Sequence, residues 1–256
     1  MPDRIGEQTA ALLCAGARAR TGRYHPLMTS PNTPHLPDAL PSEPLELVSA
    51  WFAEAAAGRA AVPDAMTLAT VDARGSPSAR IVLCKQICTR PGYVTFFTNY
   101  LSRKGSELSG NSRAAGVMYW EALRRQVRLE GPVTRTSPAE SDAYFASRPW
   151  QARVGAWASV QSSALASRAE LADAVEAAAR RLGTPSPLAS ADDAPDPGVA
   201  IPRPPHWGGY HLWVEAVELW MEGPARLHDR ARWERQLTPS ASGFAPGHWS
   251  ARRLHP

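Results

Sequence analysis

The stretch RIVLCKQICTRPGYVTFFTNYLSRK, residues 80–104, decides how the rest of the chain is interpreted. It holds two short runs, 81–83 and 94–97, which are rich in the apolar β-branched and aromatic residues typical of strands. Cationic residues bracket these runs, namely Arg80, Lys85, Arg103 and Lys104. Strands edged by fixed positive charge predict a sheet that holds an anion.

Lysine is rare in this chain, which has 28 Lys plus Arg residues but only two lysines, Lys85 and Lys104. Both fall in the stretch quoted above. Lysine presents a compact, rotatable ammonium, whereas arginine presents a planar fork. Either these two positions need a point charge, or they share one stretch by chance.

Composition excludes some classes of protein. With 256 residues, 44% of them hydrophobic, the chain can bury a sizeable core. The net charge of +4 permits anionic partners, but the arginines are scattered, so we expect small anions and no nucleic acid. Cys14, Cys84 and Cys88 cannot all pair and lack zinc-site spacing, which favours a reducing, cytoplasmic location without a metal. The first apolar run, 9–15, is too short to span a membrane.

Two proline-rich zones interrupt the chain. Residues 1–41 show no sustained period and are predicted to be a disordered leader, with Met28 as an alternative start. Residues 42–256 are expected to form one domain. Within it, residues 184–205 are predicted to be a proline-rich loop.

Local signals predict helices and strands in the remaining segments. A serine cap at Ser102, proline in a first turn and the capping box 137–140 predict helices over 44–58, 103–110 and 138–147. An Ala- and Arg-rich run predicts another helix over 167–182. Alternation predicts strands over 65–72, 78–86, 93–98, 115–119, 126–135 and 210–220. Arg80 and Lys85 are five apart, so either their strand bulges or one lies beyond its end. These elements predict a mainly β (α+β) barrel with peripheral helices.

The segment Arg226-Leu227-His228-Asp229-Arg230 concentrates ionisable groups. In an extended conformation Arg226, His228 and Arg230 share one face, which is unfavourable unless an anion joins them. His228 could also serve as a general acid or base. The alternative is a surface ion cluster. Likewise, Trp207-Gly208-Gly209 indicates either a planar ligand or a core anchor.

Known nucleotide, zinc and hydrolase motifs are missing from the sequence, but eight other motifs occur together. They are RIVLCK, FFTNYLSRK, RRQVRLEG, YFASRP, GAWASVQSS, HWGGY, ELW and RLHDR. In this order and spacing, between Ser42 and the C-terminus, they resemble the pyridoxine (pyridoxamine) 5′-phosphate oxidases. The resemblance implies an FMN-binding split β-barrel that is homodimeric, with FMN at the subunit interface.

The resemblance also implies a set of site residues. Those matching the family's FMN contacts are Arg80, Lys85, Phe97, Thr98, Arg103, Lys104, Gln126, Gln161, Ser162, Trp220 and Arg230. Those matching its substrate contacts are Lys85, Tyr144, Arg148, Arg226 and His228, the last two as catalytic residues. The implied reaction is the oxidation of pyridoxamine or pyridoxine 5′-phosphate by O₂ to pyridoxal 5′-phosphate and hydrogen peroxide.

The chain departs from the family at two places. Ala152 stands four residues after Arg148, where the family often has a serine, so one substrate-phosphate hydrogen bond is lost. The family's N-terminal lid residues have no counterpart in residues 29–41. Two alternatives therefore stay open: a split-barrel protein that binds flavin or pyridoxal phosphate without turnover, and a related reductase with another substrate.

Overall fold

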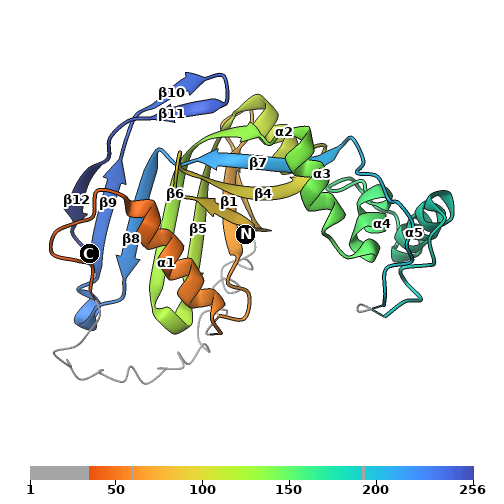
Figure 1. Cartoon of the computed structure of the whole chain (residues 1–256), viewed down its shortest axis with the longest axis horizontal. Coiled ribbons are helices and arrows are strands. Elements are labelled where there is room, and N and C mark those ends of the chain that lie inside the picture. The colour runs from red at the N-terminus through yellow and green to blue at the C-terminus, as the bar shows by residue number, and fades with distance from the viewer. Residues whose placement is uncertain (1–34, 59, 192–193) are drawn as a thin grey trace, which may run out of the picture. The chain divides into compact units, whose positions relative to one another are not determined.

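The computed structural model describes residues 35–58, 60–191 and 194–256 (Figure 1). Most of residues 1–41, including Cys14 and Met28, therefore lie outside the described part of the chain. The compact unit described below is residues 34–256.

Antiparallel strands dominate the described residues, and helices lie at the periphery (Figure 1). The strands are β1 (Ala65–Val71), β2 (Pro77–Leu83), β3 (Gln86–Cys88), β4 (Tyr93–Asn99), β5 (Arg113–Trp120), β6 (Arg125–Arg135), β7 (Trp207–Trp213), β8 (Ala216–Met221), β9 (Asp229–Glu234), β10 (Leu237–Ser240), β11 (Gly243–Pro246) and β12 (Ser250–Leu254). The helices are α1 (Pro44–Ala56), α2 (Arg103–Gly110), α3 (Pro138–Ala146), α4 (Trp150–Ala158) and α5 (Arg168–Leu182), with 3₁₀ turns η1 (Glu121–Leu123) and η2 (Pro224–Arg226). The predicted mainly β class with peripheral helices is confirmed.

One long strand joins the two arms of the main sheet. The first arm has the order β12-β9-β8-β6-β5-β1-β2, and the second continues from β6 through β7 to β4 and β3. β6 serves both arms because residues 125–130 pair with β8 and residues 133–135 pair with β7. At the switch, a Cβ on Gly131 would lie 1.9 Å from the Trp213 carbonyl oxygen. Only glycine allows this close approach of the backbones. The approach occurs where the sheet curls into a half-barrel.

Two apolar clusters stabilise this arrangement. The larger one lies between the curled sheet and α1, whose Leu45 and Val48 are fully buried. The smaller one joins α3, α4 and α5 around Phe145 and Val154, and it includes Trp207 of β7. The burial of β6 alternates along its length, as its sequence pattern predicted.

The predicted helix starts are confirmed at three serine caps. The side chains of Ser102, Ser137 and Ser167 accept hydrogen bonds from the backbone N–H three residues later. Helix α4 occupies residues that the sequence left unassigned. Among the described residues, no helix has both the length and the apolar character that crossing a membrane requires.

Two predicted strands differ from the structure. The strand expected over 78–86 ends at Leu83, so Lys85 lies beyond its end, which was one of the two alternatives. The strand expected over 210–220 is in fact β7 and β8, which are separated at Val214 and Glu215. The break follows from the sheet, because β7 belongs to one arm and β8 to the other. The strands β10 to β12 were not predicted.

The end of the predicted leader also requires correction. Leu36 is 1% exposed, and its N–H donates to an Asp229 carboxylate oxygen at 2.7 Å. The Pro41 carbonyl accepts from the Trp233 indole N–H at 2.8 Å. Residues 35–41 therefore lie against β9, although two leucines among prolines in so short a segment give no sustained periodic signal.

Candidate functional site

A cavity of about 520 Å³ opens beside the ends of β2 and β4, where they meet α3 and α4. It brings together seven residues that the sequence predicted for FMN or substrate. They are Lys85, Phe97, Thr98, Lys104, Tyr144, Arg148 and Gln161. They come from five different segments, so the fold, rather than the local sequence, assembles them.

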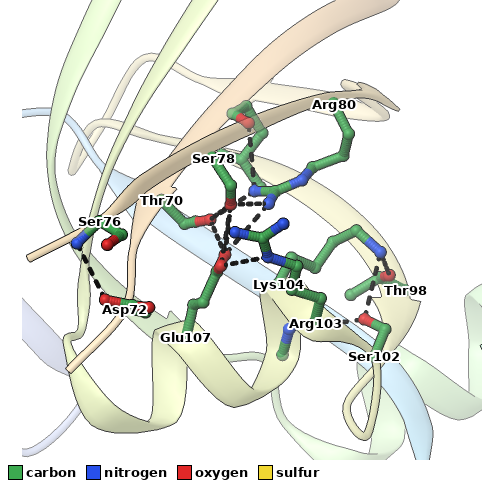
Figure 2. Close-up of polar contacts among 12 residues, drawn as sticks. Thr70, Asp72, Ser76, Ser78, Arg80, Thr98, Ser102, Arg103, Lys104 and Glu107 are labelled. Carbon is green, nitrogen blue, oxygen red and sulfur yellow. Dashed lines mark hydrogen bonds and ion pairs between the residues drawn. The ribbon is translucent and has the colours of Figure 1, made fainter. Parts of the chain in front are cut away.

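One end of the cavity adjoins a group of charged side chains that we call the basic corner: Arg80, Arg103, Lys104 and Glu107 (Figure 2). Ser102 begins α2 so that Lys104 and Glu107 both turn toward the sheet. Glu107 accepts from Arg80 at 3.0 Å and from Arg103 at 2.8 Å. These contacts explain how Arg103 is tolerated in the first turn of a helix, where a cation is disfavoured.

Lys104 is 8% exposed and is held by oxygen atoms alone. Its Nζ donates to Thr98 Oγ1 and Ser102 Oγ at 3.1 Å each, and to Gln161 Oε1 at 3.0 Å. Burial and the neighbouring Arg80 lower the pKa of this ammonium. An anion placed beside Lys104 would stabilise the charged ammonium and so offset the effects of burial and of Arg80 on its pKa.

Glu107 is the counter-charge of the basic corner. Burial raises its pKa, but hydrogen bonds from Thr70, Ser78, Arg103 and Arg80 outweigh burial and lower the pKa to about 2. Glu107 is therefore ionised at neutral pH. Three cations against this one carboxylate leave the basic corner with two net positive charges, which match a phosphate dianion.

Stacked aromatic rings form the opposite wall of the cavity. The rings of Phe97 and Tyr144 are 3.9 Å apart, and those of Phe97 and Trp207 are 5.6 Å apart. The Arg148 guanidinium lies 4.7 Å from the Trp207 ring centroid. Trp207 is buried in the core, which was one of the two alternatives raised by the sequence, and it also lines the cavity.

Arg148 carries an unsatisfied donor. Its Nη1 is buried and has no hydrogen-bond partner among the described residues. Burial also lowers the pKa of this guanidinium. A buried, unpartnered cationic N–H group in a cavity wall is costly unless a ligand accepts from it.

Lys85 and Ala152 also line the cavity, whereas Ser162 does not. Lys85 donates to Asp64 at 2.6 Å, so its charge is partly balanced before any ligand arrives. Ala152 lines the cavity on α4, one turn after Arg148, and brings no hydroxyl to it. Ser162 has a left-handed backbone with φ of 75° and does not line the cavity.

A second group of predicted residues lies on β6, β8 and β9 and in the turn between β8 and β9, and we call it the C-terminal cluster: Gln126, Trp220, Arg226, His228 and Arg230. Gln126 pairs with Trp220 across β6 and β8, and Trp220 pairs with Arg230 across β8 and β9. Arg230 donates to Glu218 at 2.7 Å. His228 Nδ1 accepts from the Gly223 N–H at 3.3 Å, which leaves Nε2 as the protonated nitrogen of the neutral ring.

The predicted extended face of residues 226–230 is wrong. Ala225 and Arg226 have left-handed backbones, with φ of 52° and 63°, inside the turn η2. β9 begins only at Asp229, so Arg226 does not share a strand face with Arg230. Arg230 is also balanced by Glu218, a buried carboxylate that no local pattern pointed to.

On one chain the two groups lie apart. Arg230 is on β9 and Arg80 is on β2, and the strands β8, β6, β5 and β1 lie between them. Five strand spacings of about 4.8 Å correspond to about 24 Å along the sheet. The predicted residues therefore lie in two separate groups in each chain.

Comparison with known proteins agrees with this architecture. Residues 52–181 match the family described as pyridoxamine 5′-phosphate oxidase. Residues 207–256 match the pyridoxine 5′-phosphate oxidase C-terminal dimerisation region, which supports a homodimer.

Curated relatives and solved structures extend the comparison. The chain is 48% identical over 219 residues to a pyridoxine/pyridoxamine 5′-phosphate oxidase of Burkholderia orbicola, covering 86% of this chain and 91% of that protein. It is 51% identical to the Paraburkholderia phymatum protein of the same name, covering 80% and 85%. The crystal structure of PhzG from Burkholderia lata, in complex with tetrahydrophenazine-1-carboxylic acid, superposes with a TM-score of 0.70 at 30% identity, covering 86% and 95%. The chain belongs to the pyridoxamine 5′-phosphate oxidase family.

Proposed function

We propose that the protein oxidises pyridoxamine 5′-phosphate, pyridoxine 5′-phosphate or both with O₂, using FMN as its cofactor. The products are pyridoxal 5′-phosphate and hydrogen peroxide, and the amine substrate also takes up water and releases ammonia. The observation that carries the proposal is the cavity with a basic corner at one end and the unpartnered Arg148 guanidinium in its aromatic wall. Two separate cationic positions suit two phosphate groups, one on the cofactor and one on the substrate.

The residues present fit FMN. The basic corner has two net positive charges for the terminal phosphate, and Thr98 and Gln161 add polar atoms beside Lys104. The terminal phosphate of FMN suits the basic corner, where Arg80, Arg103 and Lys104 lie together. FMN would supply the redox chemistry by accepting a hydride equivalent from the substrate and passing the electrons to oxygen.

Arg148 and Tyr144 would hold the substrate phosphate. Tyr144 lies on α3, and Arg148 lies just after it. A bound phosphate would supply the acceptor that the buried Nη1 of Arg148 lacks. Lys85 lies at the edge of the same cavity, where it would orient the pyridine ring. Holding the ring at a fixed place is the main contribution of the protein to the rate.

His228 and Arg226 would complete the site from a second chain. In one chain they lie on the C-terminal cluster, away from the cavity, and the 207–256 segment matches a dimerisation region. A twofold arrangement could bring the C-terminal cluster of one protomer over the cavity of its partner. Trp220, Gln126 and Arg230 would then meet the flavin, and Arg226 and His228 would face the reacting carbon.

Oxygen uptake tests the proposal. Purified protein loaded with FMN should consume oxygen with pyridoxamine or pyridoxine 5′-phosphate and should form pyridoxal 5′-phosphate in equal amount. Omission of the substrate phosphate, by using pyridoxamine or pyridoxine, should reduce kcat/KM strongly because Arg148 then stays unpartnered. A flavin-loaded protein that consumes no oxygen with either phosphate would instead support a binding protein without turnover.

A second candidate is the oxidation of a partly reduced tricyclic carboxylic acid. It is favoured by the likeness to PhzG, whose structure holds tetrahydrophenazine-1-carboxylic acid. The guanidinium of Arg148 can donate to a carboxylate as readily as to a phosphate. Ala152 also lacks the hydroxyl with which a serine at this position would donate to a phosphate. Oxygen uptake measured with such an acid, in place of pyridoxamine or pyridoxine 5′-phosphate, decides between the two candidate functions.

A further inference from the structure

A second cavity, of about 460 Å³, lies where the segment before α1, the loop between β3 and β4, and the segment between β11 and β12 meet. We call it the Arg235 pocket. None of the residues predicted for FMN or substrate lines it. Its volume lies in the range of small-molecule sites.

Arg235 is a buried cation whose hydrogen bonds are incomplete. It is 8% exposed and lines the pocket. Its Nε donates to the Val214 carbonyl at 2.8 Å, and its Nη2 donates to the carbonyls of Pro91 and Gly92 at 3.0 and 3.1 Å. A guanidinium has five N–H groups. Its Nη1 group therefore has no partner in the described part of the chain.

No carboxylate balances this charge at ion-pair distance within residues 35–58, 60–191 and 194–256. Glu43, at the rim, instead lies 4.0 Å from Arg90. Burial lowers the pKa of Arg235 to about 10, although Glu43 raises it slightly. The guanidinium is covered on one face by Trp249, whose ring centroid is 4.2 Å away. Covering one face leaves the in-plane N–H groups available.

Trp249 adds a donor that is both buried and unsatisfied, whereas the Arg235 Nη1 group lacks a protein partner within the described ranges but is not fully buried. Its indole Nε1 is buried and has no acceptor among the described residues. Two unpartnered donors, one of them on an uncompensated cation, are the groups that an oxyanion would satisfy.

The charges and shape of the pocket define the class of ligand. Arg90 and Arg235 against Glu43 leave one net positive charge, which matches a monoanion better than a phosphate dianion. Pro91, Pro246 and Trp249 add apolar surface beside the donors. We propose that the Arg235 pocket binds a small organic acid with a single carboxylate, which accepts from Arg235 and Trp249 while Arg90 closes the rim.

Benzoate is a suitable probe, and benzamide is its neutral control of the same shape. Binding is followed by ligand-observed NMR saturation transfer on the full chain. Trp249→Phe keeps an aromatic ring against Arg235 but removes the N–H, and Arg90→Gln removes the rim charge from a side chain that is 77% exposed. Arg148→Ala is the matched control, because it removes a cation from the first cavity instead.

Benzoate should bind more tightly than benzamide, and each pocket variant should weaken it about tenfold, as expected for a lost charged hydrogen bond. Arg148→Ala should leave the benzoate binding that depends on Arg90 and Trp249 unchanged. Loss of benzoate binding in Arg148→Ala alone, equal binding of benzamide, or no saturation transfer at millimolar benzoate would each overturn the proposal. Circular dichroism checks the fold of each variant, and the exposed Arg90→Gln decides the matter if Trp249→Phe does not fold.

Discussion

Trp220 and His228 face each other across the turn between β8 and β9, with ring centroids 4.7 Å apart and planes inclined by 42°. His228 is further fixed because its Nδ1 accepts from the Gly223 N–H. A Cβ on Gly223 would lie 1.9 Å from the Leu227 carbonyl oxygen, so the turn requires glycine there. The turn therefore engages Nδ1 of His228 and leaves its Nε2 without a hydrogen-bond partner among the described residues.

This orientation predicts different effects for the residues of the C-terminal cluster. His228→Ala and Arg226→Ala should each retain FMN and lower kcat/KM by at least about tenfold, because both are assigned to the reacting face. Arg230→Ala should lose FMN first, since it is assigned to the flavin. Oxygen uptake and flavin titration on the three variants provide the measurement. Full turnover in both His228→Ala and Arg226→Ala would place the active site elsewhere.

Arg148 should act on substrate binding rather than on flavin binding. Arg148→Ala should raise KM for the phosphorylated substrate by at least about tenfold, because a charged hydrogen bond contributes about 1.5 to 3 kcal/mol. FMN content should stay unchanged. Arg181→Ala is a matched control, since Arg181 also lies over a tryptophan, Trp157, but does not line the cavity. Equal KM values in the two variants would contradict the assignment.

Lys104 should make FMN binding depend on pH. Its pKa is lowered by burial in the free protein, whereas a bound phosphate stabilises the protonated form. FMN affinity should therefore fall as the pH rises through the lowered pKa of Lys104. Lys104→Met should bind FMN weakly at every pH and lose this dependence. Flavin titrations from neutral to alkaline pH measure it, and parallel curves for both proteins would refute the role.

Glu107 should contribute to acid sensitivity. Its pKa is lowered from about 4.5 to about 2 in the folded protein, so its contribution is fully present above the unfolded pKa. The contribution is lost as the pH falls from about 4.5 to about 2, and the full shift corresponds to about 3 kcal/mol. Urea unfolding of wild type and Glu107→Gln should give stabilities that converge over this range. A gap that stays constant with pH would show that Glu107 acts through packing alone.

Leu36 should anchor the segment that precedes α1. It is 1% exposed, so Leu36→Ala should lower the free energy of unfolding by about 2 to 4 kcal/mol. Leu188→Ala is the control, because Leu188 is 60% exposed and should change stability by less than about 0.5 kcal/mol. Chemical denaturation of both variants provides the comparison. Similar stabilities would mean that residues 35–41 do not support the fold.

The sequence by itself determined the elements whose signals are local. The caps at Ser102 and Ser137, the alternation in residues 126–135 and the amphipathic helix from Pro44 all appear where they were expected. Capping and alternation depend on residues within one turn or one strand, so a single stretch of sequence contains them. The ordered motifs also sufficed to predict the family and the mainly β fold.

Only the tertiary structure decided how these elements meet. Gly131 lies against Trp213, far away in sequence, at the place where the pairing of β6 changes from β8 to β7. Arg80 pairs with the buried carboxylate of Glu107, and Arg230 pairs with that of Glu218. The spacing of residues in the sequence predicted neither pair. Close backbone approach and the pairing of buried charges depend on contacts between distant segments, so they are set by the assembled fold and not by any local pattern.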